Sequence, residues 1–370
     1  MVFPIPAGGT RVATAGEALM DLIALPDGRL QPCDGGAVYN MTRALGLQGV
    51  GTVYLNPLSR DRFGRGLQEA IHAAGVRLAR EAPVHEPTSL AVVALDAQGK
   101  ASYSFYREAV ADRQVSAAQL IEDCQAEPAL QVVATGCLAL MAEDQDKYLP
   151  WLQAERGAGR LVVVDANLRP AVVPDMDAYC ASVMHALAQA HVVKASDDDL
   201  RELGFGQDDP LEAGRALMRR LPQARWLALT LGAKGAVLMA RADAGPLAAT
   251  ATATAASASA SASASAAGGA DAALRVWSAQ ETVPVTVADT VGAGDCFIAG
   301  LLAALLACPG VAQAANAEAM RVTDQELAGV LAHAVASASL CVMQTGCQPP
   351  TREQVLARLR AAPPQVRALA

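Results

Sequence analysis

The chain has 370 residues, of which 52% are hydrophobic, and its formal net charge is −8. That much apolar material is enough for a large buried core, and the length allows one large domain or two smaller ones. An acidic chain with 4% aromatic residues lacks the basic stripe and interleaved aromatics typical of nucleic-acid binders. We therefore expect no nucleic-acid partner, and a phosphate ligand would need local basic residues and oriented backbone N–H groups.

The cysteines are scattered through the chain, and they include no Cys-x-x-Cys pair and no Cys/His grouping at zinc-ligand spacing. In a chain of this length they are typical of reduced, mostly buried side chains. The first residues lack the basic region of a signal peptide, and no uninterrupted run rich in large apolar residues is long enough to span a bilayer. We expect a cytoplasmic protein with no membrane partner. The eight cysteines are at positions 33, 124, 137, 180, 296, 308, 341 and 347.

Short apolar runs rich in β-branched residues recur along the chain, and several lack polar alternation, which is typical of strands buried on both faces. Helical patterns lie between them, at 40–49, 62–76 and 209–221. Strands that alternate with helices predict βαβ units and a parallel sheet. The predicted strands cover 11–19, 90–95, 130–136, 161–167, 191–196 and 226–232.

Two stretches, 21–36 and 88–107, break this alternation because each predicts a hairpin that is not followed by a βα pattern of its own. Their turns are expected at Pro26-Asp27-Gly28 and at 96–99. We interpret them as antiparallel strands outside the main sheet, in the manner of a flap, and the alternative is that they are edge strands of the main sheet. Exposed flap strands favour a homodimer formed by edge pairing.

The segment at about 245–273 is of low complexity and is made almost entirely of Ala, Ser, Thr and Gly. These residues bury too little apolar surface to order the chain, so we expect a disordered extension. Its flanks, 235–240 and 274–279, look like a pair of strands. Close to the end of the chain, Thr351 and Gln354 predict a capping box and a helix over 351–359.

The turn Gly292-Ala293-Gly294 stands between a strand-like stretch, 281–290, and an apolar run that predicts a helix. Backbone N–H groups at such a turn lie at the positive end of the helix dipole, which makes an anion site. Asp295, directly after the turn, either caps this helix or accepts a proton from an alcohol while the N–H groups hold phosphoryl charge. This stretch alone does not decide between the two roles.

Polar residues also follow three of the predicted buried strands, where ligands bind in open α/β sheets. Each group alone has a simpler interpretation: a salt-bridged turn at 165–170, a helix N-cap at 196–199 and a β-turn at 230–235. No P-loop motif occurs, and G-x-G-x-x-G fails at the 292–297 turn because Phe297 replaces its last glycine. The groups are Asp165, Asn167 and Arg169; Lys194, Ser196 and Asp199; and Thr230, Gly232 and Gly235.

In this order, the motifs resemble the ribokinase-like, or PfkB, family of sugar kinases. DTVGAGD (289–295) matches the C-terminal signature of that family, and the resemblance runs from Gly16 to about Pro350 apart from the alanine–serine insert. GEALMDL (16–22), FYREAVAD (105–112) and VKASDDDL (193–200) are most similar to bacterial fructokinases. The alternative within the family is a 2-keto-3-deoxygluconate kinase, or another sugar or nucleoside kinase.

The resemblance implies one kinase domain over 1–370, with a Rossmann-like, mostly parallel sheet flanked by helices and a small β-sheet lid from about 21–36 and 88–107. It also implies ATP-dependent phosphorylation of fructose to fructose 6-phosphate, with Mg²⁺ and, in many members, a monovalent cation such as K⁺. The alternative from another class is a non-catalytic, sugar-binding regulatory protein on the same fold.

The resemblance further implies a role for each matching residue. Asp295 would be the general base, and the N–H groups of Gly292, Ala293 and Gly294 would form the anion hole. Asn56 and Ser59 stand where the family has glycines in a motif near Asp61. The remaining roles are sugar binding by Asp21, Gly36, Asn40 and Arg107; the route to the phosphates for Asn167, Arg169 and Lys194; the nucleotide site for Thr230, Gly232 and Gly235; Mg²⁺ through water for Asp199; and a monovalent cation for Asp289.

Overall fold

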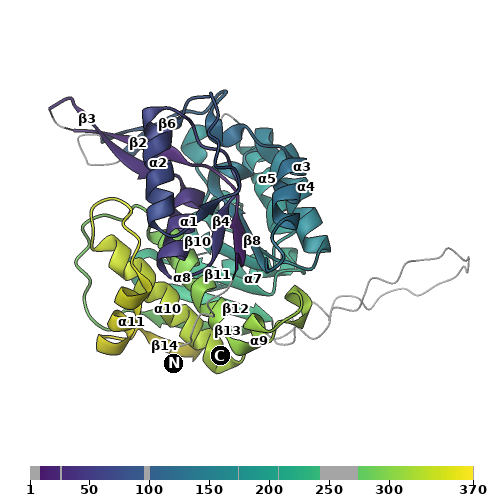
Figure 1. The fold of residues 1–370 in the computed structure, drawn as a ribbon. Helices are drawn as coiled ribbons and strands as arrows, with labels where there is room; N and C mark the ends of the chain where they lie inside the picture. The colour runs from purple at the N-terminus through teal and green to yellow at the C-terminus, as the bar shows by residue number, and fades with distance from the viewer. Residues whose placement is uncertain are drawn as a thin grey trace, which may run out of the picture.

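The computed structural model describes residues 9–25, 27–95, 101–173, 175–206, 208–241 and 274–369. Its framework is a ten-stranded main sheet and a separate four-stranded sheet (Figure 1). The low-complexity insert at about 245–273, which we predicted to be disordered, lies outside the described residues, and so does the turn expected at 96–99.

The main sheet has the strand order β14-β13-β12-β11-β10-β9-β8-β1-β4-β5. From β11 to β5 every pair is parallel, whereas β12, β13 and β14 are antiparallel, so the prediction of a mostly parallel sheet is confirmed. The pairing of β12 with β13 was also predicted, but β14 was not. The strands are β1 (Val12–Thr14), β4 (Thr52–Tyr54), β5 (Arg77–Leu78), β8 (Val132–Gly136), β9 (Leu161–Asp165), β10 (Val192–Ser196), β11 (Trp226–Thr230), β12 (Ala236–Arg241), β13 (Leu274–Gln280) and β14 (Gln365–Leu369).

Helices cover both faces of this sheet (Figure 1). Because neighbouring residues of a strand point to opposite faces, they enter different cores. Val132 and Ala134 of β8 pack into the core made with α1, α2, α8 and α10, whereas Val133 packs into the core made with α3, α4, α5 and α7. This explains why the strands read as continuous apolar runs. The helices are α1 (Ala37–Leu47), α2 (Arg62–Ala73), α3 (Ala117–Gln125), α4 (Gln145–Gly157), α5 (Met176–Leu187), α6 (Asp197–Glu202), α7 (Pro210–Arg220), α8 (Ala293–Ala307), α9 (Pro309–Ala312), α10 (Asp324–Val342) and α11 (Arg352–Ala361).

The helix α8 is apolar on all sides and buried from Asp295 to its end, as expected of a central core helix. Its neighbour α10 is long and apolar enough to cross a membrane by length and composition. However, α10 packs along α8, and Leu327, Leu331 and Ala334 are buried in the same core. The core of the protein therefore accounts for the apolar composition of α10.

The small sheet has the order β3-β2-β6-β7, so its strands lie outside the main sheet and the edge-strand alternative is wrong. The pairs β2–β3 and β6–β7 are antiparallel, and β2–β6 is parallel. In Figure 1, β2 and β3 project away from the body of the molecule. These strands are β2 (Leu19–Ala24), β3 (Leu30–Gly35), β6 (Ser89–Leu95) and β7 (Ala101–Tyr106).

The single strand predicted over 11–19 is wrong, because the chain leaves the main sheet after Thr14 and enters the small sheet at Leu19. Buried Asn56 holds the crossing point: its Oδ1 accepts from the Gly16 N–H at 2.8 Å, and its Nδ2 donates to Asp112 O at 2.7 Å. The asparagine that replaces a family glycine therefore ties two segments together with its side chain.

The strand-like stretch 281–290 forms no strand. Pro284 has no N–H to donate to a ladder, and Val283 and Val287 are exposed rather than packed on a sheet. The segment instead crosses to α8 as an extended loop, where the N–H groups of Ala288 and Asp289 both donate to Val342 O. The alternating valines resembled a half-buried strand, but the described part of this segment has no ladder pairing.

The start of α1 depends on Gly36, which has φ +101°, and a Cβ there would lie 2.6 Å from the Glu17 carbonyl oxygen. We predict that Gly36→Ala lowers the free energy of unfolding by about 2–5 kcal/mol, from backbone strain and forced displacement of Glu17. Gly49, just after the same helix, has φ +79°, and a Cβ there would have no atom within 4 Å. Gly49→Ala is the control, with an expected loss of about 1–2 kcal/mol. Urea denaturation measures both, and equal losses would contradict the prediction.

Candidate active site

The register of the parallel strands brings the predicted polar groups to one edge of the main sheet. Lys194 of β10 lies opposite Asp165 of β9, and Ser196 of β10 lies opposite Thr230 of β11. Gly136, at the end of β8, lies opposite Asp165 as well. The carboxyl ends of four neighbouring strands therefore lie level, which is where open α/β sheets bind their ligands.

Asp295 lies where the first turns of α1 and α8 meet. The Asn40 side chain donates from Nδ2 to Asp295 Oδ2 at 3.0 Å, and Asp295 is 6% exposed. The cap of α8 is Gly292, which has φ +76°, and among the described residues no side chain hydrogen-bonds to the N–H groups of its first turn. Asp295 therefore makes no capping hydrogen bond there, although its charge lies in the first turn, at the positive end of the helix dipole.

The environment of Asp295 makes it a basic carboxylate. Burial raises its pKa to about 7, although the hydrogen bond from Asn40 and the charge of Lys194 act in the opposite direction. A carboxyl with a pKa near neutrality is a stronger proton acceptor than an exposed aspartate and still ionises at physiological pH.

Lys194 places a positive charge beside the turn that opens α8. A Cβ on Gly294 would lie 3.0 Å from Lys194 Nζ, and the same Nζ is 3.0 Å from Asp165 Oδ1. Burial by itself would lower the pKa of Lys194, but Asp165 and Asp199 outweigh it and the pKa is raised. The side chain is therefore an ammonium, next to uncapped N–H groups at a helix N-terminus, and this combination suits an anion.

Glu17 is a site residue that the sequence analysis missed. Its Oε1 accepts from the N–H of Ala37 at 2.8 Å and lies 3.4 Å from the N of Val38, so it caps α1 from another segment. Burial raises the pKa of Glu17, and Arg107 opposes the shift. The signal available in the sequence was a single acidic residue, Glu17, within a run of small and apolar residues.

The predicted sugar-binding residues lie around the junction of the small sheet and α1. Burial raises the pKa of Asp21 to about 6, and Arg169 opposes this. Asp21 lies over Gly35, where a Cβ would be 2.2 Å from Asp21 Oδ2. Arg107 donates to Asp112 Oδ2 at 3.1 Å. Three buried polar atoms in this region have no hydrogen-bond partner among the described residues: Glu17 Oε2, Asn40 Oδ1 and Arg107 Nε.

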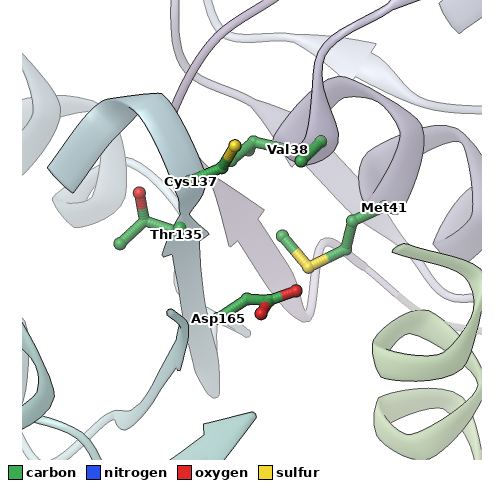
Figure 2. Close-up of a pocket in the computed structure, with 7 residues that line it drawn as sticks. Val38, Met41, Thr135, Cys137 and Asp165 are labelled. Carbon is green, nitrogen blue, oxygen red and sulfur yellow. The ribbon is translucent and has the colours of Figure 1, made fainter. Parts of the chain in front are cut away.

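A pocket opens between α1 and the ends of β8 and β9, and its empty space, including the mouth, is about 170 Å³. Figure 2 shows the Met41 side chain and the Asp165 carboxylate facing each other across it. Thr135 Oγ1 has no hydrogen-bond partner there among the described residues, whereas Asp165 Oδ1 is paired with Lys194 Nζ at 3.0 Å. The lining combines apolar side chains with a few polar groups, as ligand pockets do. It consists of Ala37, Val38, Met41, Thr135, Gly136, Cys137 and Asp165.

Asp199 is a member of a capping box, which was the simpler interpretation of its motif. Ser196 is the N-cap of α6, and Asp199 Oδ2 accepts from the Ser196 N–H at 2.7 Å and from its hydroxyl at 2.8 Å. Asp199 Oδ1 accepts from the Leu168 N–H at 2.7 Å. Three of the roughly four acceptor positions of this carboxylate are therefore used within the protein, which leaves room for one further donor such as water.

Asn167 and Arg169 form a tight loop after β9. Asn167 has φ +38°, and its Oδ1 accepts from Arg169 Nη1 at 2.7 Å. Asp289, in the loop before α8, accepts from Val291 N at 3.0 Å and from Gly346 N at 2.9 Å. It therefore joins the loop before α8 to the loop that follows α10.

Thr230, Gly232 and Gly235 form the connection between β11 and β12. Gly235 has φ +90°, and a Cβ there would lie 2.1 Å from Ala279 O, so this position requires glycine for the turn itself. Thr230 lies level with Ser196 at the sheet edge. No described hydrogen bond or ion pair joins these three residues to Asp295, so they form a second, adjacent group.

Comparisons with known proteins identify the family and the fold of the chain. Residues 10–354 match the model of the pfkB family carbohydrate kinases. A fructokinase of Rhizobium leguminosarum bv. trifolii is 30% identical over 301 residues, which are 80% of this chain and 79% of that protein.

Two solved structures share the fold. A fructokinase with bound ATP from Xylella fastidiosa has a TM-score of 0.71 and 24% identity, over 95% of this chain and 98% of that one. A double mutant of a Vibrio cholerae fructokinase, bound to fructose, ADP and potassium, has a TM-score of 0.68 and 21% identity, over 95% of this chain and 99% of that one. Both likenesses show the ribokinase-like fold that the sequence predicted. With the match along most of its length, this chain belongs to the pfkB family of carbohydrate kinases.

Proposed function

We propose that the protein transfers the γ-phosphoryl group of ATP to fructose and produces fructose 6-phosphate and ADP. The observation that carries this proposal is the buried Asp295 carboxylate, hydrogen-bonded to Asn40 and adjacent to the Gly292–Gly294 turn and Lys194. A carboxylate base directly beside an anion site suits transfer of a phosphoryl group to an alcohol. The family membership and the similar fructokinases support sugar as the acceptor and fructose as the sugar.

In this proposal, Asp295 accepts the proton of the C6 hydroxyl as the sugar oxygen attacks the γ-phosphorus. The N–H groups of Gly292, Ala293 and Gly294 stabilise the negative charge on the transferred group, and the Lys194 ammonium adds to that stabilisation. The bond from the γ-phosphorus to the bridging oxygen of ADP breaks, and the proton remains on Asp295 until the product leaves.

The sugar would be held by Asp21, Gly36, Asn40 and Arg107, with Asn167 and Arg169 toward the phosphates. The unpartnered Asn40 Oδ1, Glu17 Oε2 and Arg107 Nε support this, because a polyhydroxylated ligand offers both donors and acceptors. The small sheet would close over the sugar as a lid and exclude water, which limits hydrolysis of ATP.

The nucleotide would lie along Thr230, Gly232 and Gly235, at the adjacent strand end. Asp199 would hold Mg²⁺ through a water molecule, since its carboxylate keeps one acceptor position free. Asp289 would contribute to a K⁺ site, and a Vibrio cholerae fructokinase of the same fold has a potassium ion bound.

Asp295→Asn tests the base. We predict that turnover falls by about 10²–10⁴-fold, the usual contribution of a general base, while the dissociation constant for fructose changes only a few-fold. The amide can still accept from Asn40, so the local structure is kept. Steady-state kinetics and calorimetry measure the two quantities.

Asp209→Asn is the control for the same substitution at a helix start away from the site. Asp209 is the N-cap of α7, and asparagine caps a helix as well as aspartate does. Its turnover should equal that of the wild type. If Asp295→Asn retained more than about a tenth of wild-type turnover, Asp295 would not be the base.

The pKa of Asp295 predicts the pH profile. Because the base acts as the carboxylate and its pKa is about 7, kcat/KM for fructose should fall about tenfold per pH unit below pH 7. The Asn40 hydrogen bond lowers this pKa, so Asn40→Ala should move the acidic limb to higher pH. Tyr39 lies beside Asn40 in α1, and Tyr39→Phe, which removes a hydrogen bond to Leu67 O of α2, should leave the limb in place. A limb near pH 4 in the wild type would contradict the assignment.

A substrate panel tests the choice of sugar. ADP release with fructose, 2-keto-3-deoxygluconate and a nucleoside should give the highest kcat/KM for fructose, and phosphorus NMR should place the phosphate on C6. If either of the other substrates gave a higher kcat/KM, that compound would be the substrate in place of fructose, with the same phosphoryl transfer. Fructose binding without ADP formation would favour a regulatory protein.

A further inference from the structure

Three buried cysteines meet beneath the turn that opens α8. Cys296 directly follows Asp295, Cys341 lies near the end of α10, and Cys347 lies in the loop after α10. Their Sγ atoms all lie within 4.8 Å of one another. Three side chains with no covalent link, from three segments, therefore place their sulfur atoms together at one point.

The sulfur spacing suits a single metal ion. A zinc–sulfur bond is about 2.3 Å long, so thiolates on one zinc ion have sulfur atoms about 4 Å apart. The separations in the protein, which are at most 4.8 Å, need to shorten by about 1 Å at most to reach that value. Thiolates also select soft or borderline ions over Mg²⁺ and K⁺, which separates this cluster from the cations proposed for the kinase site.

The charged surroundings of the cluster favour a cation. The carboxylates with the strongest effect on these thiols are Asp289, which acts on Cys341, and Asp295, which acts on Cys347. Negative neighbours disfavour unpaired thiolates and favour a bound divalent ion. The loop that contains Cys347 provides access, because residues 343–345 are exposed.

We propose that Cys296, Cys341 and Cys347 bind one Zn²⁺ ion as three thiolates, with a water molecule from the 343–345 side as the fourth ligand. The three thiols release three protons as the ion binds. Three protein ligands and one open position form a recognised zinc arrangement. The long separation of these residues in sequence hid the site from any search for metal-ligand spacing.

The site is coupled to the turn at Gly292. A Cβ on Gly292 would lie 2.1 Å from Cys347 Sγ, so the thiol packs directly on the backbone of the turn. Asp289 links Gly346 N to Val291 N through its two carboxylate oxygens. When the sulfur atoms draw together around the ion, they displace the Gly292–Gly294 N–H groups. Zinc should therefore inhibit phosphoryl transfer, an effect that rests on the proposed function, whereas the binding itself does not.

The test uses the reduced, metal-free full chain and Co²⁺ as a spectroscopic probe. Titration should produce a thiolate-to-cobalt charge-transfer absorption that saturates at one Co²⁺ per chain and disappears when one equivalent of Zn²⁺ is added. Cys347→Ser and Cys341→Ser should each weaken binding at least about tenfold. Cys308→Ala is the matched control, because Cys308 is a buried thiol directly after the same helix and is not part of the cluster.

Kinase assays at constant Mg²⁺ and ATP give the second readout. One equivalent of Zn²⁺ should lower the turnover of the wild type and of Cys308→Ala, a chelator should restore it, and Cys347→Ser should be insensitive. The proposal is overturned if the reduced wild type shows no saturable thiolate-to-cobalt absorption. It is also overturned if Cys347→Ser and Cys341→Ser, shown to be folded by circular dichroism, bind Co²⁺ as the wild type does. If the zinc proposal fails, fructose phosphorylation by the metal-free enzyme can still be measured, so the two proposals can fail independently.

Discussion

The hydrogen bond from Asn40 to Asp295 joins the first turns of two helices whose contributing residues are 255 positions apart in the chain. It exists only because α1 and α8 pack against each other on the same face of the main sheet. Their N-termini meet there, so the uncapped N–H groups of α8, the carboxylate and the amide occupy one small volume. The proposed base, the anion site and part of the sugar site all depend on this junction.

Burial gives the junction its chemistry. Asp295, Asp165 and Asp21 all have pKa values raised above that of an exposed aspartate, and burial is the largest cause in each. Two cations, the buried Lys194 and the half-buried Arg169, oppose this shift and keep the carboxylates ionisable. A site of this kind costs stability, since buried charges and unsatisfied polar atoms such as Asn40 Oδ1 are unfavourable until a ligand binds.

Much of the fold could be predicted from local patterns. Runs such as 161–167 have no polar alternation because both faces of β9 are covered by helices. The capping box at Thr351 and Gln354 is a local hydrogen-bond pattern and occurs as predicted. The failures have non-local causes. The strand predicted over 11–19 is divided because Asn56 holds the chain at Gly16, and the end of 281–290 instead bonds to the last residue of α10, Val342. The strand β14 depends on pairing with the edge of β13, and no pattern within residues 365–369 predicts that pairing.

The sequence by itself determined the alternation of strands and helices, the glycine turn before Asp295 and the polar residues at the strand ends, because each is a property of a short segment. Only the tertiary structure decided that Asp295 bonds to Asn40 rather than capping α8, and that Asp199 also accepts from the Leu168 N–H of a distant loop. It also decided that Glu17 caps α1 from another segment and that Cys296, Cys341 and Cys347 lie together. These facts depend on which distant segments pack side by side, and packing is set by the whole core rather than by any one stretch of residues.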